Sequence, residues 1–277
     1  MEVRRIGRLV PVDNEGYVVR DVDAANIRPP WDAPLSAVVE ACLEHWGGNV
    51  HGIYVRGSVP RGLAVEGVSD IDCYALVRGR QFEIDTAWIE AKCHALDARF
   101  TFQTGVEIVP FSLEATRASP PPHPMYRFVQ FSLATNCVCI HGEDLSAKLP
   151  RFRPGPEIAV RALNFPSELR QTVERLGSAP DAAETRRLCA GMMKRILRTG
   201  FELVMEREQA YTRDLYFCYE AFARHYPDRE REMRRALELA VAPSGDPREV
   251  LAFVSEAGIW LLEQIAEAFP DPRPGSA

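Results

Sequence analysis

The chain has 277 residues, 46% hydrophobic and 26% charged, a balance typical of a soluble globular protein with one large core or two domains. Its net charge of -6 argues against non-specific electrostatic binding of nucleic acid, which requires a basic surface. No stretch approaches the ~20 apolar residues that cross a bilayer, and residues 1–16 lack the apolar core of a signal peptide. We therefore expect a cytoplasmic protein without membrane contact, for which nucleic acid is a disfavoured partner.

The first elements are a hairpin and a helix. Residues 5–12 and 17–20 flank the turn-forming stretch Asp13-Asn14-Glu15-Gly16, which predicts a β-hairpin that packs on the fold or forms an edge of the main sheet. Apolar residues recur at helical spacing over residues 35–46, and Gly47 then ends the helix.

Two predicted strands carry the main motif. The apolar residues 53–55 end at Gly57-Ser58, and eleven residues later Asp70 and Asp72 open a second apolar run that continues to residue 77. Side chains alternate along a strand, so the two aspartates share a face. Neighbouring carboxylates repel each other unless a cation lies between them, and a divalent metal ion is the simplest such cation.

The remaining elements of the first half are a helix at residues 82–96, a strand at 100–111 that contains Glu107, an irregular proline-rich loop at 119–124, a short helix at 128–133 and a strand at 136–140. Beyond residue 150 every segment has helical periodicity. These helices are expected at residues 157–176, 182–207, 212–225, 228–241 and 247–269, with a frayed tail at 271–277.

The fold class that follows is α+β. We expect a domain at residues 1–150, a mixed sheet flanked by helices, followed by an all-α helical bundle at residues 151–277. The seven cysteines form no disulfide framework and have no metal-site spacing. We interpret them as reduced, mostly buried thiols, consistent with the cytoplasm.

The spacing of the main motif resembles the signature of the DNA polymerase beta-type nucleotidyltransferase superfamily. Gly57-Ser58, then eleven residues, then Asp70-Ile71-Asp72 match it, and Glu107 best matches its third carboxylate, where the family more often has Asp. Three further stretches match: Arg61-Gly62, Ser69, and residues 141–145 (HGEDL), which resemble the ending of small bacterial members. The resemblance covers roughly the first half of the chain.

The resemblance implies that Asp70 and Asp72 hold two Mg²⁺ ions and that Glu107 is either a further metal ligand or the general base that accepts the hydroxyl proton. It also implies that the Gly57-Ser58 turn holds the triphosphate. Glycine admits close approach of a phosphate to the backbone, and serine offers a hydroxyl and an amide donor. Ser69 and Arg61 join the nucleotide-binding set, and Arg56 can add positive charge. The simpler alternatives are surface aspartates, a common turn, and arginines paired with nearby carboxylates.

The helical half resembles the aminoglycoside and related antibiotic nucleotidyltransferases, in which it forms the other wall of the cleft. Arg187, Gly191, Lys194 and Arg198 follow one helix face, and Lys194 is the best candidate there for a triphosphate contact. A solvated helix face is the simpler alternative. Tyr211 is a candidate for stacking on a base or acceptor, with a place in the core as its alternative.

We therefore predict a magnesium-dependent nucleotidyltransferase that moves a nucleoside monophosphate, from ATP by preference, to a hydroxyl group. The expected acceptor is a small molecule such as an aminoglycoside, bound between the two domains. Three alternatives stay open: transfer to a protein or tRNA, a biosynthetic enzyme acting on a secondary metabolite, and a catalytically silent nucleotide-binding module if Glu107 faces away from the aspartates. A homodimer is also compatible with the sequence.

Overall fold

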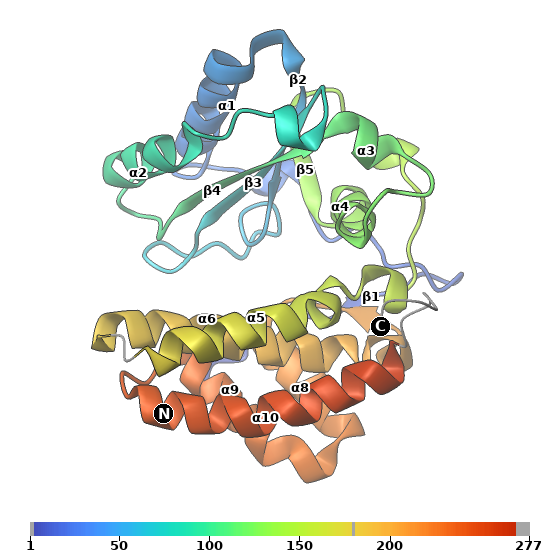
Figure 1. Cartoon of the computed structure of the whole chain (residues 1–277). Helices are drawn as coiled ribbons and strands as arrows, with labels where there is room; N and C mark the ends of the chain where they lie inside the picture. Colours follow the sequence, from blue (N-terminus) through green and yellow to red (C-terminus); the bar gives the residue numbers. More distant parts are fainter. Residues whose placement is uncertain (1–2, 179–180, 270–277) are drawn as a thin grey trace. The chain divides into compact units, whose positions relative to one another are not determined.

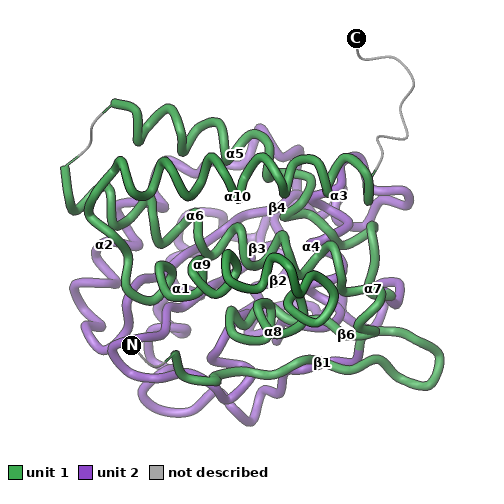
Figure 2. The backbone as a smooth tube through the Cα atoms, turned by 90° about the horizontal axis from the view of Figure 1, so that it is seen from below, with its two compact units in different colours: residues 1–18, 153–277 green, residues 19–152 purple. Residues whose placement is uncertain are grey.

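The computed structural model describes residues 3–178 and 181–269, and the tail at 271–277, which we expected to fray, lies outside these ranges. The chain forms two compact units, one of residues 19–152 and one of residues 1–18 with 153–277 (Figure 2). The predicted boundary near residue 150 lies close to the break at 152–153. The sequence did not indicate that residues 1–18 group with the C-terminal part.

The unit of residues 19–152 is built on a mixed four-stranded sheet with the order β4-β3-β2-β5 (Figure 1). Its strands are β2 (Val50–Arg56), β3 (Ile71–Val77), β4 (Val106–Ser112) and β5 (Cys137–Gly142). β3 pairs with β4 in parallel, whereas β2 pairs antiparallel with both β3 and β5. The parallel β3–β4 pair requires a crossover, and α2 (Ile89–Arg99) supplies it.

Helices cover both faces of this sheet. On one face α1 (Asp32–Trp46) and α2 pack against the strand residues that include Ile53, Val55 and Ile71. On the other face α4 (Pro124–Thr135), together with α3 (Leu113–Arg117), covers a second cluster that includes Tyr54 and Tyr74. The strict alternation of β2 and β3 therefore separates two apolar layers.

Element boundaries differ from the sequence prediction around β4. The helix expected at 82–96 begins only at Ile89, and the strand expected at 100–111 begins only at Val106. For the strand, the Asp97 carboxylate is the physical reason, because one of its oxygens accepts hydrogen bonds from the backbone N–H of Val106 and the side chain of Gln103. This local network holds residues 101–105 as a turn.

The other unit is mainly helical. Its helices are α5 (Val160–Gly177), α6 (Ala182–Glu202), α7 (Met205–Glu208), α8 (Leu215–His225), α9 (Glu230–Val241) and α10 (Pro247–Ala268). Asp181 and Asp246 cap α6 and α10 as the sequence predicts, since each carboxylate accepts a backbone N–H from the first turn. Short 3-10 turns occur at Ala24–Asn26, Gly47–Asn49, Gln81–Glu83, Ser146–Lys148, Pro156–Ile158 and Pro227–Arg229.

The N-terminal segment corrects one prediction. Its turn forms, with a bridge between Val12 and Val18, but β1 (Val10–Pro11) pairs with β6 (Ala210–Tyr211) instead of an edge of the main sheet. Side chains just after β6 explain the pairing. Asp214 accepts a hydrogen bond from the N–H of Arg8 over 2.8 Å, and the Thr212 hydroxyl donates to the Arg8 carbonyl over 2.9 Å.

All seven cysteines lie in the described part of the chain as free thiols, six of them buried. A membrane-crossing helix, one both long and apolar enough for a bilayer, does not occur within residues 3–178 and 181–269.

Candidate active site

Three charged side chains form a row across the sheet. Arg56, the last residue of β2, lies opposite Asp72 of β3, and Asp72 lies beside Glu107 of β4. Residues in register on neighbouring strands project from the same face, so all three side chains emerge together. Glu107 therefore does not face away from Asp72, which was the condition for the catalytically silent alternative.

The guanidinium of Arg56 connects the two carboxylates. Its Nη2 atom donates to Glu107 Oε2 over 2.9 Å and lies 3.3 Å from Asp72 Oδ1. The guanidinium carbon also lies 4.7 Å from the centre of the Tyr74 ring. Burial by itself favours a neutral side chain, but Tyr74, Asp72 and Glu107 outweigh it and raise the pKa of Arg56. Arg56 therefore stays cationic in this row.

Glu107 is the carboxylate with the altered acidity. Partial burial raises its pKa, the neighbouring charge of Asp72 raises it further, and Arg56 opposes both effects. Repulsion between carboxylates therefore acts between Asp72 and Glu107, and the repulsion expected between Asp70 and Asp72 stays a prediction. Asp70 precedes the first residue of β3 and is exposed.

The Gly57-Ser58 turn lies directly beside this row. Gly57 has a φ of +87°, a left-handed conformation that favours glycine, and a Cβ atom there would lie 3.4 Å from Asp72 Oδ2. Among the residues that the structure describes, the buried hydroxyl oxygen of Ser58 has no hydrogen-bond partner. A buried, unsatisfied hydroxyl in this turn is a feature that a ligand can satisfy.

The other predicted nucleotide contacts in this unit hold the loop between β2 and β3. Arg61 Nε donates to Asp21 Oδ2 over 2.6 Å, and the buried Ser69 hydroxyl accepts a hydrogen bond from the N–H of Val65 over 2.9 Å. The Ser69 carbonyl accepts another from Thr104. Both side chains thus have partners within the protein, and their contact with a nucleotide stays a prediction.

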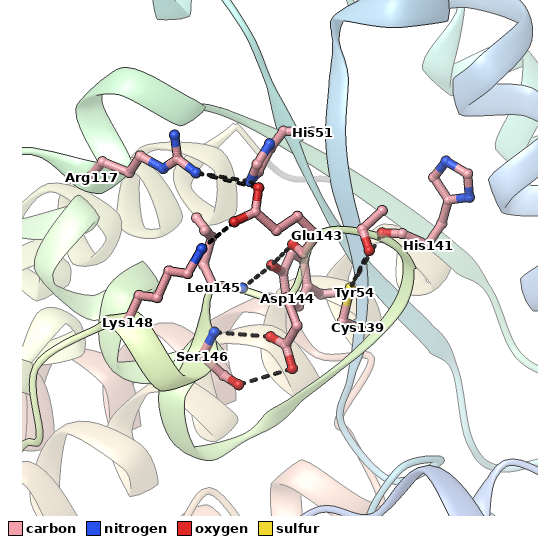
Figure 3. Close-up of polar contacts among 11 residues, drawn as sticks. His51, Tyr54, Arg117, Cys139, His141, Glu143, Asp144, Leu145, Ser146 and Lys148 are labelled. Atoms are coloured by element: carbon pink, nitrogen blue, oxygen red, sulfur yellow. Dashed lines mark hydrogen bonds and ion pairs between the residues drawn. The ribbon is translucent and has the colours of Figure 1, made fainter.

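The stretch of residues 141–145 has a structural setting at the opposite end of β2 (Figure 3). Gly142 has a φ of +81°, and a Cβ atom there would lie 2.2 Å from the carbonyl oxygen of His51. The Tyr54 hydroxyl donates to the Glu143 carbonyl and accepts from the Leu145 N–H, each over 2.9 Å. These contacts fix the end of β5.

A second charged cluster lies in the helical unit and was not predicted. It contains Arg161, Arg195, Arg198 and Arg213, and the carboxylates of Glu168 and Glu202 are among the charges that affect these arginines. The signal in the sequence is the pair Arg195 and Arg198, three residues apart on α6, of which Arg198 belongs to the predicted helix face.

The acidity of these arginines reflects their crowding. Burial, followed by the charges of Arg213 and Arg161, lowers the pKa of Arg198 to about 9. Burial and the same kind of repulsion lower the pKa of Arg161 to about 10. The Nε atom of Arg213 is buried and has no hydrogen-bond partner within residues 3–178 and 181–269. An excess of cationic groups with an unused donor is suited to binding an anion.

The remaining predicted residues of this unit differ from each other in exposure. Lys194 lies on α6 and its side chain is exposed. This exposure is compatible both with a solvated helix face and with a triphosphate contact. Tyr211 is only 4% exposed and packs against Phe201. It is therefore a core residue, which was the alternative to stacking on a base or acceptor.

The carboxylates can be tested for their fit to magnesium. Within residues 3–178 and 181–269, no three His, Cys, Asp or Glu side chains are arranged to hold a metal ion. Magnesium, however, is commonly held by one or two carboxylates together with the phosphates of a substrate. Asp72 and Glu107, joined by one guanidinium nitrogen, fit such a two-carboxylate site.

Comparison with known proteins supports the fold. No protein-family model matches the chain, and no curated protein does. Among solved structures, it is similar to spectinomycin adenyltransferase AAD(9) from Enterococcus faecialis, solved with ATP and spectinomycin. The TM-score is 0.51 and the identity 14%, over 83% of this chain and 98% of that chain. The two chains share a fold. The predicted class, an α+β domain followed by helices, is confirmed.

Proposed function

We propose that the protein is a magnesium-dependent nucleotidyltransferase that transfers a nucleoside monophosphate, by preference from ATP, to a hydroxyl group of a small molecule. The observation that carries this proposal is the row of Arg56, Asp72 and Glu107 beside the Gly57-Ser58 turn. The shared fold with an adenyltransferase solved with ATP supports it.

In the proposed reaction the acceptor oxygen attacks the α-phosphorus. A new phosphorus–oxygen bond forms, the bond to the bridging oxygen of the β-phosphate breaks, and pyrophosphate leaves. Glu107 accepts the proton of the acceptor hydroxyl, a role that suits a carboxylate with a raised pKa that is accessible from solvent. A general base in this position contributes on the order of 10²–10⁴-fold to the rate.

Asp70, Asp72 and Glu107 are the residues that would hold magnesium. When bound, the metal neutralises negative charge on the triphosphate and on the leaving pyrophosphate. Asp72 would be the central ligand because it has a carboxylate neighbour on β4 and lies beside the turn. Asp70 is exposed just before β3 and does not form a three-carboxylate group with them in the described residues, so it stays a further candidate ligand.

For nucleotide binding, the Ser58 hydroxyl and the backbone at Gly57 would contact phosphate, while Arg61 and Ser69 would shape the loop that presents them. Lys194 stays a separate candidate for a triphosphate contact. The cluster of Arg161, Arg195, Arg198 and Arg213 is, taken by itself, suited to anionic oxygens.

For the acceptor, we propose a small hydroxylated molecule of the aminoglycoside or aminocyclitol type. The resemblance of the helical half and the spectinomycin bound to the structural neighbour both support this class. Secondary metabolites of a biosynthetic pathway carry the same hydroxyl groups and belong in the same test. Protein or tRNA acceptors are the remaining alternative.

The experiment is mass spectrometry after incubation with each nucleoside triphosphate, Mg²⁺ and a panel of aminoglycosides including spectinomycin. We expect a product heavier by one nucleotidyl group, formed best with ATP and absent with the Asp72→Asn variant. Circular dichroism should show that this variant retains its fold. Full activity of Asp72→Asn would remove the basis of the assignment, and labelling of protein or tRNA alone would redirect it.

A further inference from the structure

Arg56 is an unusual residue for its place in the sheet. It ends β2 on the same face as Tyr54 and Tyr74, which belong to the apolar cluster under α4. Only 8% of it is exposed. Burial of a guanidinium is costly unless its donors are paired, so a long cationic side chain on this face needs a specific reason.

The pairing of Arg56 is incomplete. Its Nη2 atom contacts both carboxylates, whereas Nε and Nη1 are buried and have no hydrogen-bond partner among the described residues. A guanidinium that only stabilised the fold would gain more from a bidentate bond to one carboxylate, with two nitrogens donating in parallel. Two nitrogens of Arg56, which carry three N–H donors, are thus available to a ligand.

The nitrogen that is used lies where a bridging cation would lie. It contacts Asp72 Oδ1 and Glu107 Oε2 at once, at 3.3 Å and 2.9 Å. A divalent ion held by these two carboxylates would compete with Nη2 for their oxygens, because two cations there would repel each other. Nη2 would then give up both carboxylates, and the Tyr74 ring would still offer the guanidinium a surface for packing.

We propose that Arg56 is a positioning residue that holds Asp72 and Glu107 together in the metal-free protein and competes with the divalent cation for them. This inference rests on the proposed role of the two carboxylates in metal binding. The guanidinium displaced by the cation, together with its unused donors, then suits the phosphate oxygens of the triphosphate. Metal and nucleotide therefore bind with positive coupling, and the nucleotide-free protein binds the metal weakly.

The test is a Mn²⁺ titration followed by electron paramagnetic resonance of the free ion, with and without a non-hydrolysable ATP analogue. Wild type is compared with Arg56→Met, Arg56→Lys and Asp72→Asn. Arg117→Met is the matched control, since Arg117 also faces a carboxylate, that of Glu143, at 3.8 Å but in the cluster at the other end of β2 (Figure 3).

We expect Arg56→Met to tighten Mn²⁺ binding without nucleotide by about tenfold and to reduce the coupling with the analogue, which in proteins is typically about 5–150-fold. Arg56→Lys keeps the charge but loses the planar fork, so its Mn²⁺ affinity should fall between wild type and Arg56→Met. This variant carries the test if Arg56→Met does not fold. Arg117→Met should bind Mn²⁺ like wild type.

Unchanged or weaker Mn²⁺ binding in both Arg56 variants would overturn the inference. If Asp72→Asn still loses the ion in that case, the proposed function stands while the role of Arg56 is wrong. If Asp72→Asn binds Mn²⁺ like wild type, with or without the analogue, the metal role of the carboxylates fails and the inference fails with it.

Discussion

The Nε atom of Arg61 donates to Asp21 Oδ2 over 2.6 Å, joining the loop after the Gly57-Ser58 turn to a segment forty residues earlier in the chain. Both side chains are about nine-tenths buried, at 11% and 10% exposed. The same segment reaches the loop twice more, because the Asp23 N–H and the Asn26 side chain both donate to the Pro60 carbonyl. The shape of the turn therefore depends on this pair.

Removal of one member of this pair should destabilise the protein. Arg61→Met removes the ion pair of the Asp21 carboxylate, and Asp21→Asn removes that of the Arg61 guanidinium, and each loss should cost about 3 kcal/mol in the free energy of unfolding. The double variant should lose less than the sum of the two. Urea denaturation of the four proteins gives the coupling energy, and strictly additive losses would contradict the pairing.

Ser58→Ala should weaken ATP binding without lowering the stability of the fold. Because the Ser58 hydroxyl has no partner in the protein, its removal should leave the urea midpoint unchanged or slightly higher. ATP affinity should fall by up to about tenfold, the worth of one hydrogen bond to a charged phosphate. Calorimetric titration with ATP measures this loss. An unchanged affinity together with a clear loss of stability would assign the hydroxyl to the fold instead.

Arg198→Met should have opposite effects on stability and on anion binding. Burial and repulsion by Arg213 and Arg161 disfavour the charge of Arg198, so an apolar side chain of similar length should stabilise the ligand-free protein by about 1 kcal/mol or more. The KM for ATP should rise if the cluster binds phosphate. Lys194→Met is the comparison, an exposed change expected to alter stability by less than about 0.5 kcal/mol. A KM unchanged in both variants would exclude this helix from nucleotide binding.

Glu202 should make stability depend on pH. Its carboxylate accepts the backbone N–H groups of Arg161 and Ala162, but burial dominates and raises its pKa to about 7. A carboxyl with a raised pKa binds its proton more tightly in the folded state. Its contribution to stability is therefore complete below the ordinary pKa near 4.5 and is lost as the pH rises through 7.

The measurement is urea unfolding of wild type and Glu202→Gln between pH 5 and pH 8. As the pH rises, the free energy of unfolding of wild type should fall relative to that of Glu202→Gln, by up to about 3 kcal/mol. Glu256→Gln, an exposed change on α10, is the control and should follow wild type at every pH. A constant difference between wild type and Glu202→Gln would show that this carboxyl does not titrate in the range.

Local sequence determined the elements and the composition of the site. Alternation along residues 53–55 and 71–77, together with Gly57 at the end of the first run, predicted two strands joined at a turn, because strand periodicity and left-handed glycine are short-range effects. The aspartate caps of α6 and α10 followed from the same local chemistry. The α+β class required nothing beyond this order of elements.

Tertiary structure decided which charges meet. The register of β2, β3 and β4 places Arg56, Asp72 and Glu107 in one row, and no spacing along the chain reports a register between strands. The grouping of residues 1–18 with the helices, the half-buried arginines around Arg198, and the pairing of Arg61 with Asp21 also depend on distant contacts. Sequence alone therefore predicted the carboxylates as candidates, while only the folded sheet revealed the guanidinium that contacts two of them.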